Sequence, residues 1–256
     1  MRKIEPEELR LLQLDLLREF ADFCEKHQIT YYIAYGTLLG AVRHGGFIPW
    51  DDDIDVMMPH QEFEKFAALY QSDKYKVVFC KTDKIFGYPF GRLVNTETCN
   101  MCGKFEMDGV NIDIYPMYGC PASNAGRQQH LKKFWRLLTV SDFLLRVRSK
   151  LARMGLWPKK TLNFHLNNAI LRKQVKLLEK YPYGTSEYVY ISVDRKVYPA
   201  YLFEQNCKIS FEHITVDAPV KYDEWLTLRY GDYMKLPPIE QRVPYHHGNY
   251  YYHDIK

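Results

Sequence analysis

The spacing of apolar residues in the first part of the chain predicts a helix, a strand and a second helix in succession. After Pro6, leucine and phenylalanine recur every three or four residues, which predicts an amphipathic helix over 6–27. The segment TYYIAY (30–35) is β-branched and aromatic, and it predicts a strand that ends at Gly36. TLLGAVRH then predicts a short helix from Thr37, so backbone N–H groups at this turn are free to bind a phosphate.

The rest of the chain predicts short strands around one long helical segment. Strands are predicted at 51–58, 75–81, 90–95 and 111–118, and a helix that begins at Pro59 is predicted to run to about Tyr70. The segment 126–180 is predicted to be mainly helical, with an interruption near 155–158. Short strands and a helix near 223–230 are predicted over 186–256. There is no internal repeat and no low-complexity linker. The simplest organisation is a single α+β domain over 1–256, made of a core over 1–120, a helical insertion over 121–182 and a C-terminal part over 183–256 that completes the domain.

Four acids among five residues follow Trp50 in the stretch WDDDIDVMM. Side chains two residues apart in a strand share a face, so Asp51, Asp53 and Asp55 are expected to project together while Asp52 points the other way. Carboxylates this close repel one another unless a cation lies between them, and their oxygens suit Mg²⁺ or Mn²⁺. A solvated acidic turn is the alternative interpretation.

A further acid, Asp113, lies between Ile112 and Ile114 in a predicted strand. A carboxylate in such apolar surroundings is costly to bury unless it is paired or bound to a metal. Asp113 is therefore predicted to complete a metal site or to take the proton of an attacking hydroxyl. The alternative is an ion pair with a core arginine such as Arg92.

The composition of the chain limits the classes of protein to which it can belong. The chain has 256 residues, 46% of them hydrophobic, which is enough for a sizeable core. The start of the chain has no apolar signal segment and no window is apolar enough to span a membrane, so a cytoplasmic, soluble protein is expected, associated at most with the inner face of the plasma membrane. The six cysteines are expected to be reduced thiols.

These motifs together resemble a known family. The stretch YYIAYGTLLGAVRHGGFIPWDDDIDVMMPHQEFEKF, with GVNIDIYP and YGDYMKLPP further on, is similar to the LicD family of bacterial phosphotransferases, relatives of fukutin and fukutin-related protein. The resemblance implies a nucleotidyltransferase-like fold, a mixed sheet with flanking helices. The signature of that fold corresponds here to the pair Gly36 and Thr37, the acids Asp53 and Asp55, and Asp113.

The resemblance also implies an activity. Members of the family transfer a phospho-alcohol, typically phosphocholine from CDP-choline, to a hydroxyl of a cell-surface glycan or teichoic-acid-type precursor and release CMP; related members use CDP-ribitol or CDP-glycerol. A divalent ion held by Asp51, Asp53 and Asp55 would neutralise the donor diphosphate. Asp113 would bind a second ion or act as the base.

Several other residues are secondary candidates. Arg43 and Arg92 have the guanidinium fork that suits a diphosphate, with structural ion pairs as the alternative, and a surface role is favoured for the neighbouring His44. Trp50 could stack on cytosine or contact a quaternary ammonium, or be a core tryptophan. Cys99 and Cys102 are spaced like half a zinc site without a second pair, so no zinc is expected. The C-terminal tail PYHHGNYYYHD could line an acceptor pocket, although a packed tail is favoured.

The segment 127–180 is strongly basic. It holds 14 lysine and arginine residues against two acids, a charge of +12 that leaves −8 on the rest of the chain. Apolar and cationic residues alternate at near-helical spacing, as in helices that lie on anionic membranes, and a lipid-linked acceptor would make such contact useful. A solvated basic helix face is the alternative. Nucleic acid is not an expected partner, because the rest of the chain is acidic.

Three other functions compete with phospho-alcohol transfer. A glycosyltransferase that uses a nucleotide sugar can also carry a D-x-D motif, but it builds a nucleotide-binding half first, and here only two helices and a strand precede Asp53. True nucleotidyl transfer would release pyrophosphate. A catalytically inactive nucleotide- or glycan-binding module would be expected to lack one of the acids, and all are present.

Overall fold

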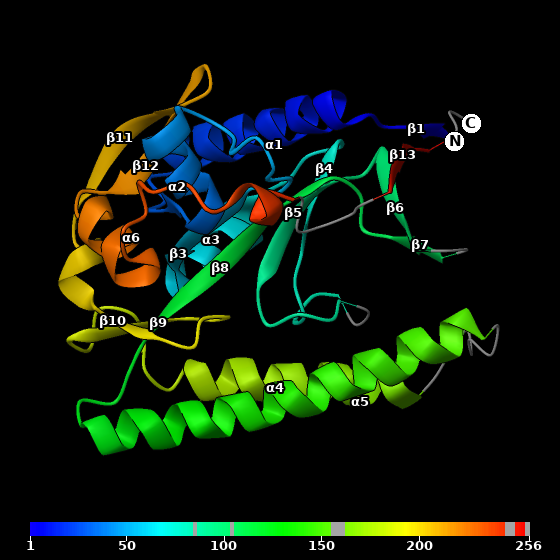
Figure 1. Ribbon diagram of the computed structural model, residues 1–256. Coiled ribbons are helices and arrows are strands. Elements are labelled where there is room, and N and C mark those ends of the chain that lie inside the picture. The colour runs from blue at the N-terminus through cyan, green and yellow to red at the C-terminus, as the bar shows by residue number, and fades with distance from the viewer. Residues whose placement is uncertain (84–85, 103–104, 155–161, 244–248, 254–256) are drawn as a thin grey trace.

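A curved mixed sheet of seven strands forms the centre of the protein (Figure 1). The computed structural model describes residues 1–83, 86–102, 105–154, 162–243 and 249–253. The central sheet contains β2 (Tyr32–Ile33), β3 (Asp55–Pro59), β4 (Tyr75–Val78), β5 (Gly91–Asn95), β8 (Asn111–Gly119), β9 (Tyr188–Ile191) and β10 (Val197–Pro199). β8 is the long central strand: it pairs with β3 on one side, and with β5 and then β9 on the other. Of the described pairings, only β3 with β8 is parallel.

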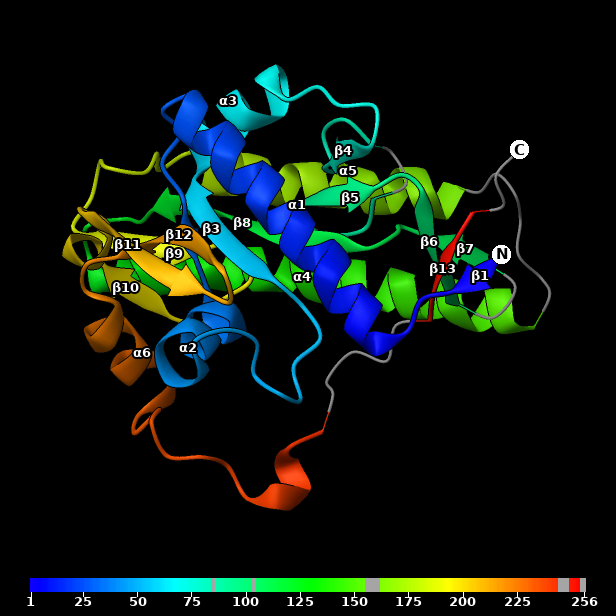
Figure 2. The same ribbon diagram turned by 90° about the horizontal axis from the view of Figure 1, so that it is seen from above.

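Two smaller sheets flank the central one. One has the order β1 (Arg2–Lys3), β13 (Tyr250–Tyr252), β6 (Thr98–Cys102) and β7 (Phe105–Met107), and it places the two ends of the chain side by side (Figures 1 and 2). The other is the hairpin of β11 (Asn206–Phe211) and β12 (Ile214–Pro219). The described part of the C-terminal tail, 249–253, is packed through β13, as the sequence favoured, and residues 244–248 lie outside the described residues.

Helices lie on two sides of the central sheet. α1 (Pro6–Lys26) crosses the upper side in Figure 1, while α4 (Asn124–Arg153) and α5 (Leu162–Leu178) form a long antiparallel pair on the lower side. The shorter helices are α2 (Tyr35–His44), α3 (His60–Leu69), α6 (Tyr222–Tyr230) and the 3₁₀ helices η1 (Ala200–Phe203) and η2 (Ile239–Gln241). No helix among the described residues is both long and apolar enough to cross a membrane.

The apolar patterns in the sequence account for most of this arrangement. On α1, Leu16 and Phe20 are fully buried, as the predicted amphipathic face requires. In β3 and β8, Val56, Ile112 and Ile114 are also fully buried. The α+β class and the mainly helical character of the segment 126–180 are confirmed, and the predicted interruption near 155–158 lies outside the described residues. α4 and α5 are attached through a separate cluster formed by Tyr118, Cys120, Phe134, Leu178 and Tyr190.

Three predicted boundaries are wrong: the start of β3 in the acidic stretch, the end of β2 and the start of α2. β3 begins at Asp55, not at Asp51, so the shared-face argument does not apply to Asp51 and Asp53. β2 ends at Ile33, where the chain turns into α2, and no strand is available on that side to pair with 51–54. α2 begins at Tyr35, not at Thr37, because the extended backbone of its N-cap, Ala34, already accepts the first helical hydrogen bond. The strands β6 and β7 were not predicted from the sequence.

Candidate active site

Three neighbouring strands place Asp55, Asp113 and Arg92 in one row across the sheet. In the parallel pair of β3 and β8, Asp55 is the register partner of Asp113. In the antiparallel pair of β5 and β8, Arg92 is the register partner of the same Asp113. Register partners project from the same face of a sheet. The two strand acids that were predicted separately are therefore direct neighbours.

Asp113 is held by three donors. Its Oδ1 accepts hydrogen bonds from Arg92 Nε at 2.7 Å and from Asn111 Nδ2 at 2.8 Å, and its Oδ2 accepts one from the Tyr115 hydroxyl at 3.3 Å. The ion pair with Arg92, which the sequence left open as an alternative, is thus present. The Arg92 guanidinium also faces the Tyr88 ring, with its carbon 4.9 Å from the ring centroid. These contacts fix both the position and the orientation of the Asp113 carboxylate.

Asp55 is the most confined of the acids. It is 7% exposed, and its Oδ1 is buried without a hydrogen-bond partner. Burial raises the pKa of the Asp55 carboxyl well above its usual value, and the charges of Asp53, Asp113 and Asp51 raise it further. Asp55 is therefore a buried carboxylate surrounded by like charges, with one oxygen available to a ligand.

Asp51 comes close to these acids although it lies outside the strand. Burial raises the pKa of Asp51 to about 7, and the charge of Asp53 and a hydrogen bond with its side chain add to this shift. The Asp51 carboxylate also lies over Gly36, where the Cβ of any other residue would collide with it. Glycine at position 36 therefore allows the acidic stretch to pack directly on the first turn of α2.

The residues at this site offer the type of ligand that a hard divalent cation prefers. The available ligands are carboxylate oxygens, which Mg²⁺ and Mn²⁺ prefer, and Asp55 Oδ1 is an orphaned buried acceptor. A positive ion would also offset the repulsion that raises the pKa of Asp51 and Asp55. Within the described residues, no group of three or more His, Cys, Asp or Glu side chains is already arranged to hold a metal.

Thr37 ties α2 to β3. Its side chain is 3% exposed, and its hydroxyl accepts a hydrogen bond from the Asp55 backbone N–H at 2.8 Å. The phosphate-binding role that the family resemblance implies for Thr37 therefore has a structural component that the sequence did not reveal.

Replacing Thr37 with valine is expected to lower the free energy of unfolding by about 1–3 kcal/mol, because it leaves the buried Asp55 N–H without an acceptor. Thr37→Ser keeps the hydroxyl and is the matched control. Chemical denaturation of the three proteins measures the effect. Equal losses in the serine and valine variants would show that the hydroxyl does not hold Asp55.

The remaining predicted candidates lie around one edge of the site. Arg43 donates from Nη1 to the Tyr233 carbonyl at 2.8 Å. Trp50 packs partly buried against the core, with the His44 ring at 5.9 Å edge-on and the Arg242 guanidinium carbon 5.4 Å from its ring centroid. Roles for Arg43, Arg92 and Trp50 in binding a donor remain predictions. Cys99 is buried, and the side chain of Cys102 lies outside the described residues.

Of the tyrosines around the acids, sequence reasoning missed Tyr115 and Tyr230, and it included Tyr250 only within a C-terminal tail that could line a pocket. Tyr115, two residues after Asp113 on the same strand face, was detectable from the strand period alone. Tyr250 comes from the C-terminal strand β13, and burial raises its pKa to about 12. The charge of Arg92 lowers this pKa, and the charge of Asp113 raises it. Tyr230, at the end of α6, also has a pKa raised to about 12, with burial the main cause and Asp55 and Asp51 contributing.

Tyr35 precedes Gly36 and has an unusual backbone. Its φ of 45° is in the left-handed region, which is costly for a residue with a side chain. The ring makes an edge contact with Tyr115 at 5.3 Å and lies under the Arg229 guanidinium at 4.7 Å. Arg229 is itself fixed by two 2.9 Å hydrogen bonds from Nη1 to the Asp194 carboxylate. This packing holds the strained start of α2 against the acids.

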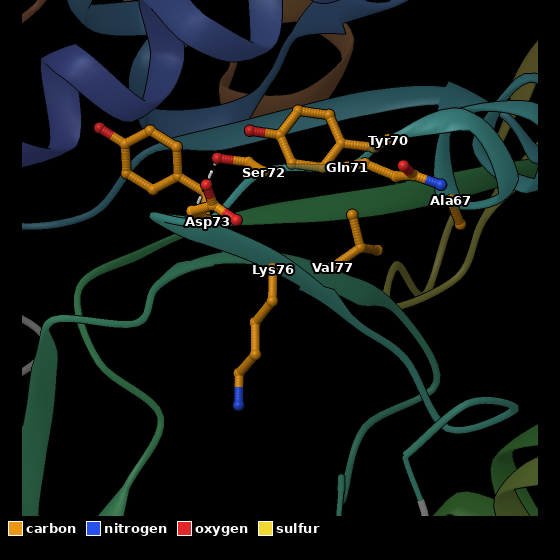
Figure 3. A pocket seen from close by; sticks show the side chains of 8 residues that line it. Ala67, Tyr70, Gln71, Ser72, Asp73, Lys76 and Val77 are labelled. Carbon is orange, nitrogen blue, oxygen red and sulfur yellow. Dashed lines mark hydrogen bonds between the residues drawn. The ribbon is translucent and has the colours of Figure 1, made fainter.

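Two surface hollows lie elsewhere. One of about 530 Å³ is formed by residues of 67–77 at the end of α3 and the edge strand β4 (Figure 3). Its lining includes Asp73 and Lys76, and the Lys76 side chain extends away from the other labelled side chains. The other hollow, of about 640 Å³, includes Tyr32, Glu62 and Tyr183. Neither hollow contains any of the four site acids.

Comparisons with known proteins bear on this arrangement. Residues 28–143 match the family model described as LicD/FKTN/FKRP, nucleotidyltransferase domain. The chain is 28% identical over 260 aligned residues to the lipopolysaccharide cholinephosphotransferase LicD of Haemophilus influenzae, an alignment that covers 96% of this chain and 97% of that protein. An uncharacterized protein of Rickettsia typhi is 38% identical over 71 residues, covering 28% of this chain and 23% of its own length. Another, of Rickettsia prowazekii, is 47% identical over 47 residues, which is 18% of each chain.

The matched segment contains α2, the acidic stretch, β3, β5 and β8, and so all of the predicted site residues. The resemblance expected from the sequence motifs is confirmed: residues 28–143 match the nucleotidyltransferase domain of the LicD family.

Proposed function

We propose that this protein is a phosphotransferase that moves phosphocholine from CDP-choline to a hydroxyl of lipopolysaccharide or a similar cell-surface glycan and releases CMP. The observation that carries the proposal is the pairing of Asp55 with Asp113 across β3 and β8, beside the glycine-containing first turn of α2. The name of the Haemophilus influenzae relative, which aligns with almost the whole chain, supports choline phosphate as the transferred group and lipopolysaccharide as the acceptor.

The donor diphosphate is expected to bind at the first turn of α2. Backbone N–H groups at a helix start are donors without helical partners, and they favour phosphate oxygens. Gly36 lets an anion approach this turn closely, since it has no side chain, and Asp51 lies against it. Two anions at one place would repel, so the donor is expected to bind with a cation between its phosphates and Asp51.

Asp51, Asp53 and Asp55 would hold that cation, Mg²⁺ or Mn²⁺, with Asp113 beside them. When bound, it would neutralise charge on the diphosphate and on the leaving CMP. The chain itself supplies a rigid arrangement of ligands: Thr37 fixes the backbone of Asp55, and three donors orient Asp113.

Asp113 is the residue we assign to the acceptor hydroxyl. Its carboxylate is held in one orientation and is accessible, since the side chain is 14% exposed, whereas Asp55 is buried. It would accept the hydroxyl proton as the acceptor oxygen attacks the phosphorus and the bond to CMP breaks. Ring faces of Tyr115 and Tyr250 near the acids would exclude water, which competes with the glycan as acceptor.

Product analysis tests the proposal. With labelled CDP-choline, Mg²⁺ and lipopolysaccharide that lacks phosphocholine, the protein is expected to release CMP and to transfer label to the glycan in equal amounts. CDP-ribitol, CDP-glycerol and UDP-sugars are run in parallel, with Asp55→Asn as the inactive control. Label transferred from a UDP-sugar, or pyrophosphate released from CTP, would overturn the proposal in favour of glycosyl or nucleotidyl transfer. Donor binding without transfer to any acceptor would indicate a binding module.

A further inference from the structure

The outer face of α4 combines exposed apolar side chains with cations. Phe143 is 63% exposed, Met154 60% and Val140 47%. The exposed cations on the same helix are Lys132, Lys133, Arg136, Arg146 and Lys150. Residues 136, 140, 143, 147, 150 and 154, the last directly after the helix, follow the spacing of one helix face, and Lys132, Lys133 and Arg146 flank this face. We call these exposed apolar residues and cations together the α4 stripe.

This stripe is directed away from the rest of the protein. The opposite face of α4 carries the buried residues His130, Phe134 and Ser141, which pack toward α5 and the sheet. In Figure 1, α4 runs along the lower border of the molecule, and the central sheet and α1 lie above it. Phe143, Met154 and Val140 therefore expose about half or more of their surface on the side away from the protein.

Charge identifies the partner that fits. α4 carries eight lysines and arginines over 30 residues and one acid, Asp142. A solvated basic helix is usually stabilised by acids three or four residues from its cations, and α4 has only one such acid. Cations that flank exposed aromatic and aliphatic side chains suit a surface with negative headgroups above an apolar layer. We infer that the α4 stripe docks the protein on an anionic lipid membrane.

The docking face lies close to the candidate active site. Leu145, on the inner side of α4, contacts Gly87. Gly87 lies in the loop whose aromatic residues, Phe86, Tyr88 and Phe90, surround the Arg92 guanidinium, and Arg92 pairs with Asp113. One short loop thus connects the membrane-facing helix to the site acids. The docking inference rests on the surface alone and does not require the proposed transfer activity.

Vesicle co-sedimentation of the full chain tests the inference. We expect binding to phosphatidylcholine vesicles that contain about one third phosphatidylglycerol, weak binding to phosphatidylcholine alone, and loss of binding at high salt. A variant with Lys132→Gln, Lys133→Gln and Arg136→Gln is expected to bind about 100-fold more weakly, at roughly fivefold for each of the three cations. Phe143→Ser is expected to weaken binding about tenfold or more.

Matched controls remove the same groups from other faces. Leu11 on α1 is 61% exposed, so Leu11→Ser controls for the loss of an exposed apolar residue. The triple change Lys26→Gln, Lys221→Gln and Lys235→Gln controls for the loss of three exposed cations. Both controls are expected to bind as the unaltered protein does, and thermal unfolding checks that all variants are folded.

Three results would overturn the docking inference. These are no binding to anionic vesicles, equal binding to neutral vesicles, or equal weakening by the α4 variants and their controls. Tighter binding to a DNA or RNA duplex than to vesicles at the same salt, with the same sensitivity to the α4 variants, would assign the stripe to nucleic acid instead.

Discussion

Replacing Asp55 with asparagine is expected to lower the rate of phosphocholine transfer by about 10²–10³-fold while making the metal-free protein more stable. The substitution keeps the shape of the side chain and removes a buried charge that faces Asp51, Asp53 and Asp113. Relief of that repulsion is expected to raise the free energy of unfolding above neutral pH by about 1–3 kcal/mol. Loss of activity with gain of stability is the signature of a site built for a bound cation.

Asp52→Asn is the matched control for this prediction. It changes the net charge by the same amount within the same acidic stretch. The substitution keeps the backbone carbonyl of residue 52, which accepts a 2.9 Å hydrogen bond from Gln13 Nε2. Activity is expected to stay within a few-fold of the unaltered protein. Initial rates of CMP release and denaturation in EDTA measure the two effects. An active Asp55→Asn protein, or one that loses stability, would refute the assignment of Asp55.

The site shows which parts of an active site can be predicted from one sequence. Asp55 and Asp113 were predicted individually, because each is an acid within an apolar strand, a local pattern. Their pairing depends on the parallel register of β3 and β8, which are separated by more than fifty residues, and no local pattern encodes that register. Arg92 was left with two interpretations for the same reason: the ion pair requires the register of β5 as well.

The wrong boundaries have a related cause. WDDDIDVMM has an alternating segment that favours a strand, but strands need neighbours, and β2 is only two residues long. The acidic stretch instead folds back on Gly36, so Asp51 reaches the other acids by a turn and not by strand periodicity. The sequence offered the tail that contains Tyr250 as a possible pocket lining, but not its place beside the acids, because that place depends on the pairing of β13 with β1 and β6.

Site and scaffold are connected through α2. Its first turn supplies the proposed phosphate-binding N–H groups, its Thr37 holds Asp55, and its strained first residue, Tyr35, is packed between Tyr115 and Arg229. A residue with φ of 45° at a helix start persists only if its surroundings compensate the strain. The Asp194–Arg229 ion pair supplies part of that compensation, although it lies behind the acids and touches none of them in the described contacts.

In the metal-free protein, the contribution of Asp51 to stability is expected to fall as the pH rises from about 4 to about 8. The pKa of Asp51 is about 7 in the folded protein, above the value of an unfolded aspartate, so the folded state binds the proton more tightly. The stabilising contribution is complete below the unfolded pKa and is lost as the pH passes the folded pKa, a decrease of about 2–4 kcal/mol. Thermal and chemical unfolding in EDTA, compared between the unaltered protein and Asp51→Asn, isolates this carboxyl group from the others. If the free energy of unfolding changed with pH in the same way in the two proteins, the crowding of acids around Asp51 would be contradicted. Mg²⁺ is expected to restore the lost stability above pH 7 only in the protein that retains Asp51, because a bound ligand stabilises the folded state.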